Sequence, residues 1–127
     1  MRWILVLSLG VGFVACDRGP TSPEQFLIRV DSLTAPAQAS YAEPFTVTFY
    51  GRIGGNTCYS LRRVEREYSP VAVDFTFVGE RCVSGGGYAV VVSLNQPELI
   101  QVSRLGPFAI RVHQPDGSTL TRNLTVH

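Results

Sequence analysis

Residues 108–126 read FAIRVHQPDGSTLTRNLTV, and this stretch decides the fold. Apolar and polar residues alternate on both sides of Pro115-Asp116-Gly117. A period of two is the pattern of half-buried β-strands. Asp-Gly favours a tight turn between antiparallel strands. We therefore predict a β-hairpin that turns within residues 114–118.

The same period of two recurs through most of the chain. It predicts seven strands, within residues 26–30, 45–49, 58–67, 71–77, 88–94, 108–112 and 120–126, with Arg122 interrupting the last one. Turn-forming residues separate them: Ala35-Pro36, Glu43-Pro44, Gly51 to Asn56, Ser69-Pro70, Gly85-Gly86-Gly87, Asn95-Gln96-Pro97 and Gly106-Pro107. No stretch after Gln25 carries a helical period. About seven short antiparallel strands in about 100 residues predict an all-β, immunoglobulin-like antiparallel β-sandwich. A small closed barrel is the alternative.

Composition excludes several classes of function. The chain has 127 residues, 45% of them hydrophobic, which suits one small globular domain. All eleven basic side chains are arginine, and the net charge is only +1. That charge leaves no excess to neutralise phosphates, so we expect no nucleic-acid partner. Without lysine, neither a Walker-type phosphate loop nor a Schiff-base enzyme can be built.

The N-terminus has the form of a secretory signal. Met1 and Arg2 supply positive charge, and residues 3–15 are apolar or small. Thirteen helical residues reach about 20 Å, which is short of the roughly 30 Å of hydrocarbon in a bilayer. The run ends in Phe13-Val14-Ala15-Cys16. We therefore expect residues 1–15 to direct export rather than to span a membrane.

This ending resembles the lipobox of bacterial lipoproteins. The resemblance implies that the signal is cut before Cys16, and that the Cys16 thiol and the new amino group are acylated. Two or three acyl chains hold a protein stably on a membrane, whereas one does not. Residues 16–25 then form a lipidated, flexible tether, and residues 26–127 form the β-sandwich domain. An ordinary cleavable signal with an incidental Cys16 is the alternative.

The rest of the chain resembles the immunoglobulin-like or fibronectin-like domains of bacterial envelope lipoproteins. The residues that carry the likeness are Val30-Asp31-Ser32, Pro44 to Phe49, Gly55 to Tyr59 and Phe108 to Val112. The likeness covers nearly all of residues 26–127 and implies a sandwich on the outer side of a bacterial cytoplasmic membrane or elsewhere in the envelope. Because one fold serves many functions, it does not imply a particular ligand.

Cys58 and Cys82 remain after Cys16 is assigned to lipid, and an exported domain is normally oxidised. A hairpin that turns at Ser69-Pro70 places these two cysteines directly opposite each other or one residue away from that position. For Val64 to share the core with Phe75 or Phe77, however, the hairpin needs a β-bulge between Tyr59 and Val64. We predict a Cys58–Cys82 disulfide. The alternative, a redox or metal-binding pair, lacks a Cys-x-x-Cys spacing.

Residues suited to catalysis are few. His113 is out of phase with Ile110 and Val112, so we expect it on the polar face beside Arg111, and His127 ends the sequence. Glu65 and Glu67 alternate along one strand, which is typical of an exposed row rather than a glycosidase pair. Gly85-Gly86-Gly87 is typical of a turn. Asn123-Leu124-Thr125 matches the eukaryotic glycosylation acceptor, and we interpret the match as a coincidence of the strand sequence. We predict no catalytic residue, metal or cofactor.

A cluster of arginines has two interpretations. Arg62, Arg63 and Arg66 alternate with Glu65 and Glu67, and Arg52 and Arg81 are expected nearby. One interpretation is a charged, solvent-exposed face that discourages edge-to-edge aggregation. The other is a docking patch for an acidic envelope protein, since Tyr59 and Tyr68 flank the cluster and arginine with aromatic residues is typical of interface centres.

The sequence as a whole predicts a lipid-anchored, non-catalytic binding or assembly module of the bacterial envelope, held to the membrane through Cys16. A small envelope enzyme or ligand carrier is the second hypothesis, and it requires a concave pocket with convergent polar groups. A purely structural domain is the third.

Overall fold

The computed structural model describes residues 23–83 and 87–127, and the regular secondary structure in these ranges is entirely β-strand. The strands are β1 (Glu24–Leu27), β2 (Val30–Thr34), β3 (Gln38–Ala39), β4 (Phe45–Asn56), β5 (Tyr59–Ser69), β6 (Ala72–Arg81), β7 (Ala89–Ile100), β8 (Gly106–His113) and β9 (Thr119–Val126). The predicted signal segment, Cys16 and Gly85-Gly86 lie outside the described residues.

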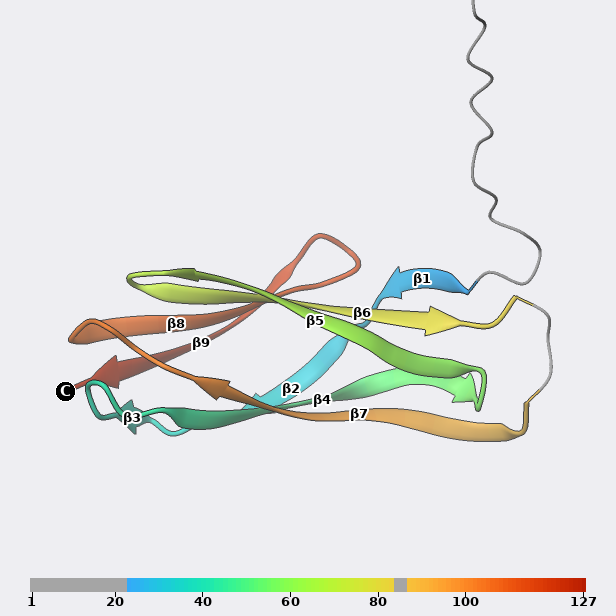
Figure 1. The fold of residues 1–127 in the computed structure, drawn as a ribbon, viewed down its shortest axis with the longest axis horizontal. Coiled ribbons are helices and arrows are strands. Elements are labelled where there is room, and N and C mark those ends of the chain that lie inside the picture. The colour runs from blue at the N-terminus through green and yellow to red at the C-terminus, as the bar shows by residue number, and fades with distance from the viewer. Residues whose placement is uncertain (1–22, 84–86) are drawn as a thin grey trace, which may run out of the picture.

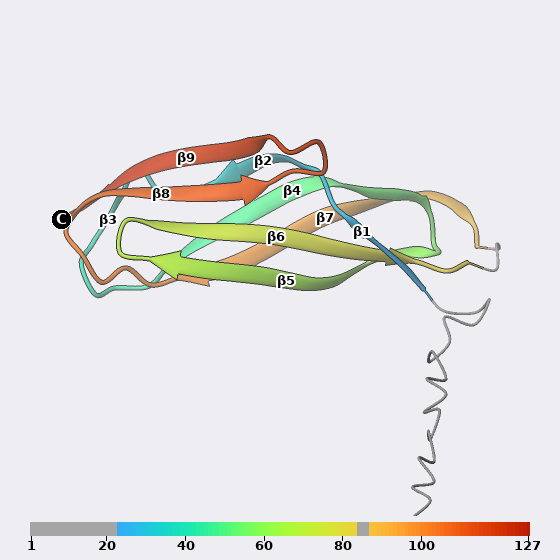
Figure 2. The ribbon, with the colours of Figure 1, turned by 90° about the horizontal axis from the view of Figure 1, so that it is seen from above.

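Two sheets pack face to face (Figures 1 and 2). In the larger, six-stranded sheet β6 pairs with β5 along one edge and with β1 and β8, one after the other, along its other edge, and β9 and β3 follow β8. The smaller sheet has the order β2-β4-β7. The all-β sandwich is confirmed, with nine strands in the described part of the chain instead of about seven. The β6–β8 and β3–β9 pairs are parallel. For β6 and β8 the reason is their connection, because the chain crosses to the smaller sheet as β7 between them.

The first predicted strand is divided between the sheets. β1 pairs with the end of β6, and the Ile28 N–H still donates to the Phe77 carbonyl at 2.8 Å. From Val30 the chain runs as β2 in the smaller sheet. Both Ile28 and Val30 are buried, so the alternation marked the core residues correctly although one continuous strand was wrong. β1 also begins two residues earlier than expected, inside the predicted tether.

Three predicted turns lie in strands instead. Asn95-Gln96-Pro97 and Gly51 to Asn56 both lie within strands, because β4 and β7 pair from Phe45↔Ile100 to Asn56↔Ala89. Pro97 is tolerated since β7 is an edge strand, where a missing N–H breaks no ladder bond. The glycines are accommodated by register shifts between Arg52 and Gly54 and between Gly54 and Asn56. Gly106-Pro107 likewise begins β8 and is not a linker.

Three phenylalanines form the centre of the sandwich. Phe49 of the smaller sheet lies with its ring centroid 4.9 Å from those of Phe75 and Phe77, which belong to β6 of the larger sheet. All three side chains are fully buried. Aliphatic side chains of both sheets surround them, including Ile28, Val47, Val73, Ile100, Ile110 and Val112. Burial of these rings joins the two sheets.

The β5–β6 hairpin has the predicted register. Tyr59 pairs with Arg81, a bulge lies between Leu61 and Arg63, and Val64 then pairs with Phe77. The bulge predicted from the sequence is therefore confirmed. Cys58 and Cys82 lie just beyond the paired residues with their Cα atoms 5.4 Å apart, and they form the predicted disulfide. The bond closes the end of the hairpin that is farthest from its turn.

The C-terminal hairpin is also confirmed. β8 and β9 pair from Gly106↔Val126 to His113↔Thr119. At the turn the Gly117 N–H donates to the Gln114 carbonyl at 3.1 Å, and Gly117 has a φ of 85°. Only glycine adopts such a φ without strain, so Asp116-Gly117 provides the turn as expected. Arg122, which interrupts the apolar pattern, donates to the Leu33 carbonyl of β2 at 3.2 Å.

We predict that thiol labelling of the unfolded but unreduced protein modifies neither Cys58 nor Cys82, whereas labelling after reduction modifies both. Replacing both (Cys58→Ser with Cys82→Ser) should lower the free energy of unfolding by about 3 kcal/mol, because the bond closes a loop of about 25 residues in the unfolded chain. Denaturant titration measures the difference. Modification of either cysteine before reduction would contradict the bond.

Candidate functional site

The structure brings polar side chains considered for catalysis to one hollow of about 160 Å³, which is lined by Glu65, Arg66, Glu67, Asp74, Thr76 and His113. His113 lies beside Arg111 on the outer face of the larger sheet, where both contact Asp74: His113 Nε2 is 3.1 Å from Asp74 Oδ1, and Arg111 Nη2 donates to Oδ2 at 3.0 Å. Glu65 and Glu67 are exposed. Across residues 23–83 and 87–127, no three His, Cys, Asp or Glu side chains are grouped so that they could hold a metal ion.

The arginine cluster is neutralised by neighbouring carboxylates. Arg62 pairs with Glu80 at 2.8 Å, on the outer face of the larger sheet. Arg63 pairs with Glu65 at 2.8 Å and also donates to Gln25 of β1 at 3.0 Å. These pairs are solvent-exposed, so each contributes less than about 1 kcal/mol to stability.

The two tyrosines of the predicted patch lie at opposite ends of β5. The Tyr59 ring is half-buried and meets Phe26 edge to face, with centroids 5.7 Å apart. It also lies against Gly54, where an added Cβ would clash with the Tyr59 ring. Tyr68 is 46% exposed near the hairpin turn. The five residues predicted for partner binding are thus spread along β5 and over both of its faces.

Arg81, which was expected near this cluster, lies beside Tyr59. It forms an ion pair with Glu24 at 2.5 Å, which fastens β1 to the end of β6. Hydrogen bonds with Tyr59 and Glu24 raise the pKa of the Arg81 guanidinium. Its role in the described structure is therefore to hold the point where the chain enters the sandwich.

Arg66 differs from its neighbours because it closes the open side of the sandwich. β5 and β7 are the facing edge strands of the two sheets and do not pair. Arg66 Nη2 of β5 lies 2.5 Å from Glu98 Oε2 of β7. The Glu98 side chain is only 7% exposed. A buried carboxylate needs such a partner, so this ion pair fixes the separation of the two edges.

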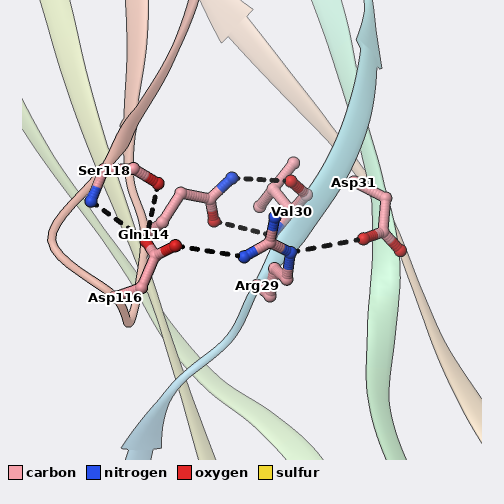
Figure 3. Close-up of polar contacts among 6 residues, drawn as sticks. All are labelled: Arg29, Val30, Asp31, Gln114, Asp116 and Ser118. Atoms are coloured by element: carbon pink, nitrogen blue, oxygen red, sulfur yellow. Dashed lines mark hydrogen bonds and ion pairs between the residues drawn. The ribbon is translucent and has the colours of Figure 1, made fainter.

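The opposite side of the sandwich is closed by the buried amide of Gln114 (Figure 3). The Val30 N–H donates to Gln114 Oε1 at 3.0 Å, and Gln114 Nε2 donates to the Val30 carbonyl at 2.7 Å. The side-chain amide thus pairs with Val30 as a neighbouring strand would. It holds the chain where it leaves the larger sheet for the smaller one.

Charged residues surround this amide on the surface. Arg29 lies 3.5 Å from Asp116 and 3.9 Å from Asp31 (Figure 3). The hydroxyl and N–H of Ser118 both donate to Asp116 Oδ1, at 2.6 and 3.0 Å. These bonds lower the pKa of the Asp116 carboxyl. Asp116 therefore stabilises the turn when it is ionised, and this contribution is lost as the pH falls through its lowered pKa.

A groove of about 540 Å³ opens at the end of the sandwich that carries the β5–β6 turn. We call it the end groove, and its lining residues are Tyr68, Ser69, Pro70, Leu99, Gln101, Ser103 and Phe108. A hollow of about 230 Å³ shares Phe108 with it. We call this the side hollow, and its other lining residues are Val71, Arg104, Leu105, Pro107, Ala109 and Asn123. Four apolar or aromatic residues on their rims are 46–61% exposed: Tyr68, Val71, Leu99 and Leu105.

The sequence analysis did not predict the buried roles of Glu98 and Gln114, nor the end groove. A signal existed for the first two, since Glu98 is in phase with Leu94 and Ile100, and Gln114 is in phase with Ile110 and Val112. Polar residues at inward positions indicate buried pairing. The end groove had no comparable signal, because it is lined by residues of β5, β7, β8 and two connecting segments.

Comparison of the chain with protein-family models, curated proteins and solved structures found no match. The sandwich itself is consistent with an immunoglobulin-like domain. No helix long and apolar enough to cross a bilayer occurs in the segments that the structure describes.

Replacing Gln114 by alanine should lower the free energy of unfolding by about 2–4 kcal/mol, because two buried backbone groups of Val30 lose their partners. The matched control is Gln101→Ala, which removes an exposed amide and should change stability by less than about 0.5 kcal/mol. Denaturant titrations compare the two variants. A loss in Gln114→Ala no larger than in the control would contradict the role of the amide.

Arg66→Ala should destabilise the protein by about 2 kcal/mol, because it leaves the buried Glu98 carboxylate unpaired while solvent screens part of the loss. Arg63→Ala, which removes an exposed ion pair, should cost less than about 1 kcal/mol. The double variant Arg66→Met with Glu98→Leu should recover most of the loss, since apolar residues can replace a buried pair. Thermal or denaturant unfolding measures all three, and equal losses in Arg66→Ala and Arg63→Ala would refute the distinction.

Proposed function

We propose that this protein is a lipid-anchored, non-catalytic module of the bacterial cell envelope that binds or assembles with another envelope component. The observation that carries the proposal is the N-terminal sequence, in which a basic start and an apolar run lead to Val14-Ala15-Cys16. The anchor fixes the position of the domain and raises its local concentration. The mechanism is passive, with the sandwich presenting a surface to its partner.

Two further features support the proposal. A disulfide in a domain of this size is typical of proteins that leave the reducing cytosol, and Cys58 and Cys82 form one. The chain also enters the fold at Glu24, at one end of the long axis, so the opposite end is free to meet a partner (Figure 1).

A small-ligand carrier is the second candidate. The volume of the end groove, about 540 Å³, falls within the usual range for ligand sites. A carrier would differ from an assembly module in retaining a small molecule through purification.

Cys16→Ser should abolish incorporation of labelled palmitate and release the protein from the membrane fraction, because no thiol remains to carry the diacylglycerol. The matched control is Cys58→Ser with Cys82→Ser, which removes two thiols and leaves Cys16 in place, so it should still incorporate palmitate. Fractionation and radiolabelling measure both. A Cys16→Ser protein that stays on the membrane and takes up palmitate would contradict the proposal.

A further inference from the structure

The two ends of the sandwich differ in chemistry. β1 begins at one end, beside the Cys58–Cys82 disulfide, where Glu24 pairs with Arg81. The β5–β6 turn and the segment that joins β7 to β8 lie at the other end (Figures 1 and 2). Residues of this turn and this segment line the end groove and the side hollow. The most exposed apolar rim residues of this end, Leu99 and Leu105, are 60% and 61% exposed.

The tether cannot fill the end groove. From Cys16 to the first described residue the chain has eight residues, which reach at most about 29 Å. β6 alone has ten residues and spans about 30 Å between the two ends. With Cys16 in the bilayer, as proposed, these residues are needed to reach from the bilayer to Pro23 and are not available to the end groove. A segment that occupies the end groove must therefore come from another molecule.

Charge indicates what such a segment carries. Six arginines of the described part lie within 4.0 Å of a carboxylate: Arg29, Arg62, Arg63, Arg66, Arg81 and Arg111. Arg52, Arg104 and Arg122 have no carboxylate within that distance among residues 23–83 and 87–127, and of these three Arg104 lines the side hollow. It is also the single charged residue in the lining of the two cavities. An exposed guanidinium beside an apolar rim favours a bound segment that carries one acidic side chain among apolar side chains.

The edges of the sheets indicate the conformation of the segment. In the described structure β7 has no strand partner on the side away from β4, and β5 has none on the side away from β6. Upstream of Leu99, Pro97 offers no N–H and the Arg66–Glu98 ion pair closes the gap. Downstream of Glu98 the open edge continues through Leu99 and Ile100 into residues 101–103, which is room for about five extended residues. An extended peptide can add to such an edge.

We infer that the end groove and the side hollow together bind an extended segment of another envelope protein, with apolar side chains on the rim and one acidic side chain on Arg104. The inference rests on the proposed function, because it names the surface and the partner chemistry of the binding module. Ser69, Gln101 and Ser103 offer hydrogen bonds to the peptide backbone. The partner meets the domain at the end that lies farthest from the anchoring bilayer.

The test selects a random twelve-residue peptide library on the mature, lipidated protein in nanodiscs. Enriched peptides should share apolar residues and an Asp or Glu, and fluorescence anisotropy should give an affinity that falls at least about tenfold with Leu99→Ser or Arg104→Glu. The matched control is Val91→Ser, since Val91 is 61% exposed on the same strand at the other end. It should leave affinity unchanged. Replacing the peptide carboxylate by arginine should restore binding to Arg104→Glu.

Three outcomes would overturn the inference: no enrichment over the starting library, peptides that bind Leu99→Ser and Arg104→Glu as tightly as the unaltered protein, or a small amphiphile that native mass spectrometry finds bound and that Leu99→Ser releases. The last would favour a ligand carrier. The selection is repeated on the Cys16→Ser protein, so that the groove is judged even where palmitate labelling shows that the anchor is absent. Failure of the groove and failure of the anchor are thereby separated.

Discussion

The buried amide of Gln114 is the interaction on which the arrangement of the sandwich depends. The N-terminal chain leaves the larger sheet after Ile28 and joins the smaller one at Val30, and this crossing leaves the buried N–H and carbonyl of Val30 without a strand on the side away from β4. Gln114 supplies an acceptor at 3.0 Å and a donor at 2.7 Å, which a strand would otherwise provide. With the crossing fixed, β1 can pair with the end of β6 while β2 pairs with β4. The entry point of the chain is thereby set at one end of the molecule.

This crossing makes the two long sides of the sandwich unequal. One side is covered by backbone, as the N-terminal segment passes from β6 to β4 and then to β9. The other side has two unpaired edges, β5 and β7, joined by the Arg66–Glu98 ion pair. Edge strands invite pairing with other chains, and inward charges, bulges and proline are the usual protection. Between them, β5 and β7 have all three of these features. This favours the interpretation of the arginine cluster as a charged face that discourages edge-to-edge aggregation.

This protection does not extend to the end groove. Beyond Glu98 the two edges diverge around the end groove, and the neighbouring arginine, Arg104, has no acidic partner in the described part of the chain. The same end carries exposed leucines, and the opposite end carries the disulfide, the incoming chain and the exposed side chains of Tyr88, Val90 and Val91. The proposed membrane anchor at one end and an apolar, cationic hollow at the other would give the domain a direction, and this polarity is the physical basis of the proposed role.

Local sequence determined the elements and their partners across short loops. Alternation marked the core residues, Asp116-Gly117 marked the last hairpin, and the demand that Val64 share the core with Phe77 required the bulge that brings Cys58 beside Cys82, because these features depend on contacts between neighbouring strands. Tertiary structure decided the division of the first strand between the sheets, the continuation of β7 through Pro97, the burial of Glu98 and Gln114, and the end groove. These depend on which distant strand lies beside a backbone group or an inward charge. A pattern along one strand shows that a residue points inward, but only the assembled sheets supply the partner that satisfies it.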